Sequence, residues 1–324
     1  MQDTKNNISR RGFLHYLGVM GLSLTTHKFL GGALPVLGSG RTACSNPRMH
    51  FTLDELQIFN TRFNARGLPT RLLGDTGVVV PRMGLGLGSR FCNLAIKDEQ
   101  QAIEMLHYAL DNGFYYWDTA PAYTYTDKAS NRTVYSEQVV GYVTKYRREE
   151  IFLNSKMCTR DPEEMERSME NTLRLLNTDR LDMIMIHAVQ NTEDIEVIRR
   201  AKIIERLERM REQGLFRLLG FSCHDEAEAI HIMAGTGRFD TVLMALDPYR
   251  HSKSGPREEE VTLASSHGMG VMLMKAVRGY ENRSGTDFNQ TIRCALEFPG
   301  ATGAMVGMDS KDIVDKNLAL LRSL

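Results

Sequence analysis

Four polar side chains of complementary chemistry stand at, or just after, the ends of apolar segments. Asp118 ends one such segment and Tyr123 follows five residues later, while Lys156 and His187 end the next two. A tyrosine phenol, with a pKa of about 10, is a weak acid at neutral pH. A neighbouring ammonium lowers that pKa, a carboxylate keeps the ammonium charged, and an imidazole orients a carbonyl oxygen or relays a proton. This set is suited to reducing a carbonyl group, in which a hydride reaches carbon while the tyrosine protonates oxygen.

Each of these residues alone has a simpler structural explanation. Asp118 could cap a helix, and Lys156 could extend its stem along the end of a strand. Tyr123 could be an ordinary loop aromatic, since Tyr125 is close by. A lone His187 is more often a hydrogen-bonded core residue than a catalyst. The combination favours chemistry, because four compatible groups follow three consecutive apolar segments.

Short apolar segments alternate with longer amphipathic ones from residue 71 to residue 324. The apolar segments predict strands at 83–88, 114–120, 151–156, 181–187, 216–222, 239–246, 270–276 and 303–308. Alternating strands and helices indicate a parallel sheet, and eight units in about 250 residues predict an α/β fold of the (β/α)8 TIM barrel type. Side chains at the carboxyl ends of barrel strands face the active site, which would bring the four polar groups together.

Helices are predicted between these strands, including 98–113, 162–176, 193–214 and 309–321. Asp161 and Pro162 are suited to the start of the second of these, and glycines end the first and third. Before the first barrel strand, RLLGDTGVVV (71–80) predicts a β-hairpin that would close the bottom of the barrel. A doubly wound nucleotide-binding fold is the main rival, but GLGLG (84–88) does not have the spacing G-x-G-x-x-G.

The chain from residue 71 onward resembles the aldo-keto reductase family. The matching segments, in the order found in the family, are RLLGDTGVVVPRMGLGLG (71–88), WDTAPAY (117–123), SEQVVG (136–141), FLNSKM (152–157), LRLLNTDRLDMIMIH (173–187), LGFSCHD (219–225) and VGMDSKDIVDKNL (306–318). The resemblance implies an NAD(P)H-dependent oxidoreductase that reduces aldehydes or ketones to alcohols, or runs in reverse. It also implies that Tyr123 is the proton donor, that Lys156 and Asp118 tune it, and that His187 positions a small-molecule carbonyl or alcohol substrate.

The same resemblance implies a nicotinamide cofactor, NADP with NAD as the alternative, bound across the mouth of the barrel. The positions that would contact it are Ser222, Cys223, Lys275, Arg278, Gly307, Ser310, Lys311 and Asn317. Several of them depart from the family pattern: Cys223 replaces an asparagine, and Lys311 stands in for the arginine that usually holds the 2′-phosphate. These departures leave a second function open, that of a cofactor-binding sensor or accessory subunit with little or no turnover.

The first 45 residues predict an export signal rather than part of the fold. The segment SRRGFL (9–14) resembles the twin-arginine signal, and a short apolar stretch follows at 12–24. We expect recognition by the twin-arginine translocase, export to the periplasm, and a linker at 46–70; an amphipathic helix is the simpler alternative. An uncleaved signal, or a lipid on Cys44, would anchor the protein to a membrane, although Arg41 stands where a lipidation site has an apolar residue.

Composition excludes some partners. The chain has 40 Lys and Arg residues against 40 Asp and Glu residues, so it lacks the excess of basic residues that nucleic-acid binding requires. Its five cysteines are scattered without CxxC spacing, which argues against a disulfide framework, a zinc site or an iron–sulfur site. Outside the cytoplasm a soluble nicotinamide cofactor is not freely available, so an exported reductase would hold its cofactor tightly and exchange electrons with a redox partner.

Overall fold

The computed structural model describes residues 62–224, 226–245, 258–276 and 287–324, all within the compact unit Pro47–Leu324. The predicted signal segment, most of the predicted linker and Arg278 lie outside these residues. Among the described residues, no helix combines the length and the apolar character needed to cross a bilayer.

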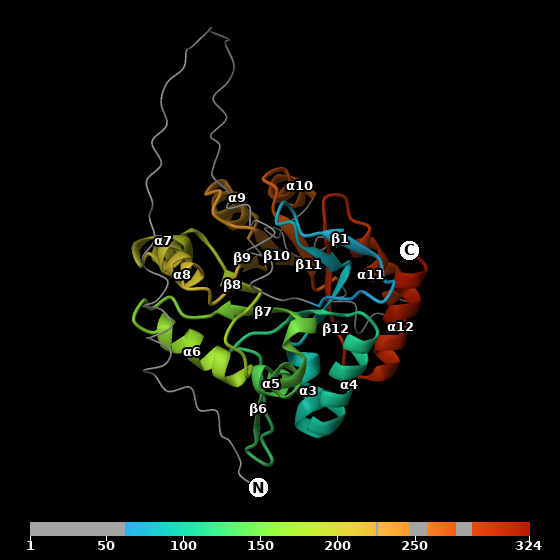
Figure 1. The fold of residues 1–324 in the computed structure, drawn as a ribbon. Coiled ribbons are helices and arrows are strands. Elements are labelled where there is room, and N and C mark those ends of the chain that lie inside the picture. The colour runs from blue at the N-terminus through green and yellow to red at the C-terminus, as the bar shows by residue number, and fades with distance from the viewer. Residues whose placement is uncertain (1–61, 225, 246–257, 277–286) are drawn as a thin grey trace, which may run out of the picture. The chain divides into compact units, whose positions relative to one another are not determined.

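Eight parallel strands form a closed barrel, which confirms the predicted TIM-barrel fold (Figure 1). Their order around the barrel is β10 (Thr241–Ala245), β11 (Gly270–Met274), β12 (Gly303–Gly307), β3 (Met83–Gly86), β4 (Tyr116–Asp118), β7 (Phe152–Met157), β8 (Met183–Val189) and β9 (Leu218–Cys223). The ring closes because β9 pairs with β10. Almost every strand residue is buried, as expected for a parallel sheet that packs on both faces.

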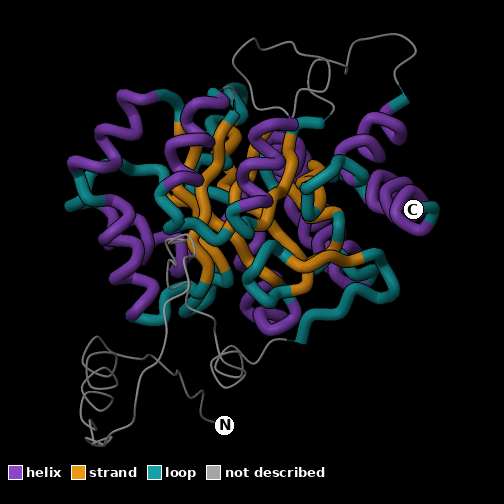
Figure 2. Tube along the Cα trace, turned by 90° about the horizontal axis from the view of Figure 1, so that it is seen from above, coloured by secondary structure: helices purple, strands orange, loops and turns teal. Residues whose placement is uncertain are grey.

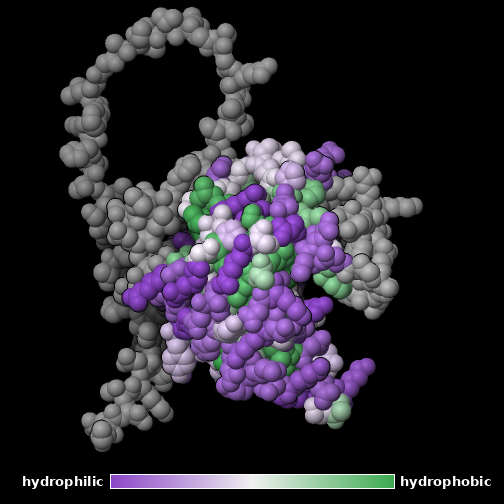
Figure 3. All heavy atoms as spheres, turned by 90° about the vertical axis from the view of Figure 1, so that its right-hand side faces the viewer, coloured by the Kyte–Doolittle hydropathy of each residue, from purple (hydrophilic) through white to green (hydrophobic). Residues whose placement is uncertain are grey.

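Helices surround the strands (Figure 2). In chain order they are α3 (Ser89–Lys97), α4 (Glu99–Asp111), α5 (Ser136–Arg147), the 3-10 helix η1 (Arg148–Glu150), α6 (Met165–Leu175), α7 (Thr192–Arg200), α8 (Ile203–Glu212), α9 (Ala227–Gly235), α10 (Glu258–Ser266), α11 (Phe288–Leu296) and α12 (Lys311–Arg322). The α-helices turn an apolar side inward, whereas η1 has no buried residue. In α12 the inward side includes Val314, Leu318 and Leu321. The outer face around α11 and α12 is mainly hydrophilic (Figure 3).

Two helix predictions were wrong in detail. The segment 193–214 is not one helix, because Lys202 adopts a left-handed backbone with φ of 53° and separates α7 from α8. A side chain with a Cβ is disfavoured in that conformation, so the amphipathic pattern hid the break. Asp161 caps a turn rather than a helix: its Oδ1 accepts the backbone N–H of Glu163 at 2.9 Å, and α6 begins only at Met165.

A second small sheet follows β4 and was not predicted. It consists of β5 (Thr124–Thr126) and β6 (Thr133–Tyr135), which pair antiparallel and lead directly into α5. Its first strand begins next to Tyr123, so the hairpin fixes where that residue's loop leaves the barrel. The backbone N–H of Ser136 donates to the carbonyl oxygen of Tyr123 at 2.9 Å, which ties the two ends of the hairpin together.

The predicted N-terminal hairpin is present as β1 (Thr70–Leu72) and β2 (Val79–Pro81). Its turn lies at the amino-terminal end of β11, and Leu73 and Val80 are fully buried. Gly74, with φ of 58°, sits so close to the backbone of residues 268–270 that a Cβ would overlap it. This contact requires glycine both for its conformation and for its size. The hairpin therefore closes the bottom of the barrel, as predicted.

Part of the predicted linker also packs on the barrel. Phe63 stacks on Tyr115 with ring centroids 5.1 Å apart, Leu68 is buried, and the backbone N–H of Arg62 donates to the carbonyl oxygen of Glu149 at 2.6 Å. The folded unit therefore includes residues from at least 62 onward. Polar and apolar residues in this segment do not alternate with a helix or strand period, so the sequence did not predict that it packs on the barrel.

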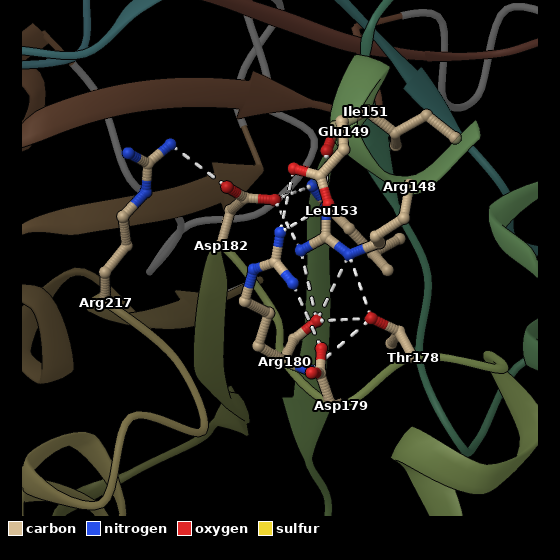
Figure 4. A network of polar contacts seen from close by, with 9 residues as sticks. All are labelled: Arg148, Glu149, Ile151, Leu153, Thr178, Asp179, Arg180, Asp182 and Arg217. Atoms are coloured by element: carbon tan, nitrogen blue, oxygen red, sulfur yellow. Dashed lines mark hydrogen bonds and ion pairs between the residues drawn. The ribbon is translucent and has the colours of Figure 1, made fainter. Parts of the chain in front are cut away.

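A buried ion cluster joins the amino-terminal ends of β7, β8 and β9 (Figure 4). One oxygen of Asp182 accepts from Arg148 Nη2 at 2.8 Å and from the backbone N–H of Leu153 at 2.9 Å. The other accepts from Arg217 Nη2 at 3.0 Å. The guanidinium of Arg217 also lies 5.6 Å from the ring centroid of Phe152. A single carboxylate thus ties three neighbouring strands together at the end of the barrel opposite the candidate site.

Candidate active site

A cavity of about 1080 Å³ opens at the carboxyl ends of the barrel strands. Its wall includes strand ends from β3, β4, β10, β11 and β12, together with residues of α11 and α12. The lining residues are Gly86, Gly88, Ser89, Arg90, Asp118, Ala122, Tyr123, Thr124, His187, His224, Leu243, Met274, Lys275, Ala276, Asp287, Phe288, Asn289, Ile292, Met305, Val306, Gly307, Ile313, Lys316 and Asn317. This is where ligands bind in barrels of this type.

Asp118, which lines the cavity, forms a buried ion pair with Lys156. Lys156 Nζ donates to Asp118 Oδ1 at 2.6 Å and to the carbonyl oxygen of Thr119 at 2.8 Å. Asn154 Nδ2 donates to the same carboxylate oxygen at 2.5 Å. Burial alone disfavours the ammonium, but Asp118 and Tyr123 outweigh it and raise the pKa of Lys156. Lys156 is therefore charged at neutral pH.

Tyr123 lies beside this pair, as the sequence predicted. Lys156 Nζ is 4.6 Å from the centroid of the Tyr123 ring. Burial raises the pKa of Tyr123, the charge of Lys156 offsets part of that rise, and Asp118 adds to it. The predicted effect of Lys156, which lowers the pKa of Tyr123, is present, but desolvation is the larger effect and the net shift is upward. The phenol is a protonated donor at neutral pH, with a cation in place to stabilise the phenolate.

His187 completes the group from the side of β8. Its ring meets that of Tyr123 edge to face, with centroids 5.8 Å apart, and its Nδ1 lies 3.1 Å from Cys158 Sγ. Burial, followed by the charge of Lys156, lowers the pKa of His187 to about 3. The imidazole is therefore neutral at physiological pH, and it can donate or accept one hydrogen bond without placing a second cation beside Lys156.

The backbone around His187 is irregular and held from two sides. Ala188 has φ of 49°, and the pairing of β8 with β9 shifts between residues 186 and 189. Ser222 Oγ accepts the backbone N–H of Ala188 at 2.8 Å, while Arg160 Nη2 donates to the carbonyl oxygen of His187 at 2.8 Å. Bulges re-aim side chains next to active sites. Here the bulge turns the end of β8 so that His187 borders the cavity.

The structure separates the predicted cofactor residues into two groups. Lys275, Gly307 and Asn317 line the cavity together with three of the predicted catalytic residues, Asp118, Tyr123 and His187. The fourth, Lys156, is buried behind Asp118 and does not line it. Four others do not line it: Ser222 and Cys223 are buried in β9, Ser310 caps α12 by accepting the N–H of Ile313, and Lys311 pairs with Glu104 Oε2 at 3.5 Å. The eighth, Arg278, lies outside the described residues.

Some cavity residues were missed by reasoning from the sequence. On α12, Ile313, Lys316 and Asn317 share one helix face at spacings of three and four, and that spacing could have pointed to Lys316 rather than Lys311. Arg90 follows the end of β3 and pairs with Asp309 at 3.3 Å, while Lys316 pairs with Asp312 at 2.7 Å. Both cations thus border the cavity with carboxylate partners already in place.

Comparison with known proteins identifies the family. A model of the Aldo/keto reductase family matches residues 82–287. The chain belongs to this family. Among curated relatives, the aldo-keto reductase YhdN of Bacillus subtilis is 27% identical over 165 residues, which are 46% of this chain and 45% of that protein. The methylglyoxal reductase DkgA of Salmonella typhimurium is 28% identical over 122 residues, 37% of this chain and 38% of that protein. The chain thus aligns with less than half the length of either relative.

Solved structures of the family share the fold. A putative aldo-keto reductase from Pseudomonas aeruginosa superposes with a TM-score of 0.65 at 24% identity, covering 82% of this chain and 98% of that one. An aldo-keto reductase from Klebsiella pneumoniae, determined in complex with NADPH, gives a TM-score of 0.59 at 21% identity and covers 79% of this chain and 90% of that one. At these identities the likeness concerns the fold.

The residues present in this aldo/keto reductase fit a nicotinamide dinucleotide. Asn317 Nδ2 is buried at the cavity wall without a hydrogen-bond partner among the described residues, which is costly unless a ligand supplies an acceptor. Gly307 has no side chain beside Arg90; a Cβ at this position would lie only 3.3 Å from Arg90 Cδ. At about 1080 Å³ the cavity is slightly larger than the usual range for pockets that bind organic ligands, about 300–1,000 Å³. Asn317, Lys275 and the backbone of Gly307 are the residues that would hold the cofactor.

Proposed function

We propose that this protein is an NADP(H)-dependent oxidoreductase that reduces aldehyde or ketone carbonyls to alcohols, or catalyses the reverse reaction. The observation that carries the proposal is that Tyr123, Asp118 and His187 line one cavity, with Lys156 bonded to Asp118 directly behind it. The same cavity is lined by Asn317, whose Nδ2 has no hydrogen-bond partner among the described residues. NADP is favoured because a Schizosaccharomyces pombe relative, 25% identical over 169 residues, is named as an NADP(+) enzyme, and because the Klebsiella pneumoniae structure holds NADPH.

In this reaction each protein group has a separate role. The bound cofactor supplies or accepts the hydride. Tyr123 gives its phenolic proton to the carbonyl oxygen, and Lys156 stabilises the phenolate that remains. Asp118 keeps Lys156 charged and fixed in position through the 2.6 Å contact. Neutral His187 borders the place where the oxygen would sit, so it can orient the carbonyl without competing for the proton.

The substrate class follows from the shape and lining of the cavity. Apolar side chains dominate one wall, among them Leu243, Met274, Phe288, Ile292 and Met305. A small carbonyl compound with an apolar substituent suits such a wall better than a charged one, because charged groups lose hydration there. DkgA, a relative named as a methylglyoxal reductase, shows that small carbonyls are substrates within this family.

A cofactor titration tests the proposal. The full chain should quench or shift nicotinamide fluorescence when mixed with NADPH, and more weakly with NADH. Asn317→Leu, which keeps the side-chain volume but removes the unpaired amide, should weaken binding by about 2- to 10-fold, the equivalent of one neutral hydrogen bond. Asn171→Leu, on the exposed side of α6, is the matched control and should leave affinity unchanged. If neither cofactor binds the wild-type chain, the oxidoreductase proposal is overturned.

We also propose export through the twin-arginine route, supported by the segment SRRGFL (9–14). Changing both Arg10 and Arg11 to lysine keeps the charge but removes the arginine pair, and it should hold the protein in the cytoplasm. Arg41→Lys serves as the control and should be exported normally. Immunoblots of periplasmic and cytoplasmic fractions measure how much of each variant is exported. Unchanged export of the double variant would refute the twin-arginine route. An exported enzyme should also purify with its cofactor bound, ready for a redox partner.

A further inference from the structure

Cys158 is a close neighbour of the candidate catalytic histidine, His187. It lies just beyond the end of β7, two residues after Lys156, and its Sγ is 3.1 Å from Nδ1 of His187. Cys158 is partly buried and is not among the residues that line the cavity. Its thiol therefore contacts the Nδ1 edge of the ring from outside the cavity lining.

The contact has two conceivable hydrogen-bond arrangements. A neutral imidazole carries one N–H, so either the thiol donates to Nδ1 or an Nδ1–H donates to sulfur. Burial raises the pKa of the Cys158 thiol, and burial followed by the charge of Lys156 lowers the pKa of His187 to about 3, so the thiol is protonated and the ring is neutral. A neutral thiol sulfur is a weak acceptor, whereas an unprotonated imidazole nitrogen is a good one. Among the described residues the thiol has one other acceptor, the carbonyl oxygen of Lys156, but that oxygen is 4.0 Å from Sγ, whereas Nδ1 is 3.1 Å away. The arrangement in which the thiol donates to Nδ1 is therefore the stable one.

The other described groups around His187 do not form hydrogen bonds with its ring. Arg160 Nη2 donates to the backbone carbonyl of His187 rather than to the ring, and it is also paired with Asp194 at 3.0 Å. Tyr123 meets the ring edge to face without a hydrogen bond. Within the described residues, Cys158 is thus the hydrogen-bond partner of the imidazole, and Nε2 has none.

We propose that Cys158 is a positioning residue that donates its S–H to Nδ1 of His187, fixes the Nε2–H tautomer and aims that N–H at the carbonyl oxygen of the substrate. This inference rests on the proposed carbonyl reduction. A carbonyl oxygen has two lone pairs, so it can accept from Nε2–H and from the Tyr123 hydroxyl together. In the other tautomer, Nε2 would present a lone pair to the same oxygen and repel it. The tautomer of a histidine is set by the partner of its second nitrogen, which here is Cys158.

The test compares donors and non-donors at position 158. Cys158→Ser keeps an O–H that can donate to Nδ1, whereas Cys158→Ala removes the donor. We expect the alanine variant to lose about 3- to 10-fold in kcat/KM for a carbonyl substrate, the size of one neutral hydrogen bond, with no change in NADPH affinity. The serine variant should recover most of that loss. Cys294→Ala, at an exposed cysteine of α11, is the control and should behave as wild type.

A second readout does not depend on turnover. The ¹⁵N resonances of His187, assigned by their absence in His187→Gln, should show a protonated Nε2 and a hydrogen-bonded Nδ1 in wild type and Cys158→Ser. In Cys158→Ala the Nδ1 resonance should move to the position of a free acceptor. A protonated Nδ1 in wild type, or a serine variant as impaired as the alanine variant, would overturn the inference. If no carbonyl is reduced by any form, the proposed function fails, while the resonances still decide the hydrogen bond.

Discussion

Replacing Tyr123 with phenylalanine is expected to lower kcat/KM for carbonyl reduction by about 10²- to 10⁴-fold, the usual contribution of a positioned acid. The variant keeps the ring that packs between Lys156 and His187 and removes only the hydroxyl. Cofactor affinity should stay within about twofold of wild type, because the loss of a proton donor acts on the transition state and not on the ground state. Steady-state kinetics with a panel of small aldehydes, together with the fluorescence titration, measure both quantities.

Tyr125→Phe is the matched control for this experiment. Tyr125 lies two residues away on β5, with 42% of its surface exposed, so loss of its hydroxyl should leave kinetics unchanged. If Tyr123→Phe retained turnover within a few-fold of wild type, another group would have to protonate the oxygen, and Tyr123 would be removed as the acid. If both variants lost activity equally, the β5–β6 hairpin rather than a single hydroxyl would be responsible.

Asp182→Ala is expected to destabilise the protein by about 3–5 kcal/mol, because removing one partner leaves buried guanidinium groups without their carboxylate. Asp182 is 0% exposed and accepts from Arg148, Arg217 and the backbone N–H of Leu153. Domains have total stabilities of about 5–15 kcal/mol, so the change is a large part of the whole. For a unit of this size it corresponds to a fall in Tm of roughly 6–20 °C. Denaturant titration followed by circular dichroism gives the free energy of unfolding directly.

The same cluster supplies the control. Asp179 pairs with Arg180 at 3.1 Å but its side chain is 82% exposed, so Asp179→Ala should cost only about 0–1 kcal/mol. A loss below about 1 kcal/mol for Asp182→Ala would show that Arg148 and Arg217 are satisfied by other groups. In that case the cluster would not tie β7, β8 and β9 together in the way described.

Much of the fold and the four catalytic candidates could be predicted from the sequence, for a physical reason. Parallel strands buried on both faces are nearly continuous apolar segments, so a polar residue at the end of one is conspicuous. Asp118, Lys156 and His187 each occupy such an end, and barrel topology brings successive ends to one rim. Tyr123 could be added because its loop follows Asp118 directly. These inferences needed only the order of the strands.

Features that depend on three-dimensional detail could not be predicted. Whether Lys311 or Lys316 faces the cavity depends on the rotation of α12 about its axis, which the apolar pattern indicates only roughly. The contact of Cys158 with His187 depends on the bulge at Ala188. The sequence does not indicate this bulge, because alanine rarely adopts the positive φ that the bulge requires. The net pKa of Tyr123 depends on how far burial outweighs the charge of Lys156.

The packed segment ahead of the barrel sets a limit on proteolytic maturation. The family match begins at residue 82, yet Phe63, Leu68, Leu73 and Val80 are already part of the folded structure. A protease that removed an export signal at any bond before Arg62 would leave these contacts intact. A cut inside the β1–β2 hairpin would expose apolar side chains and uncover the amino-terminal ends of the barrel strands. Any cut that preserves the folded structure must therefore lie before Phe63, well upstream of the start of the family match at residue 82.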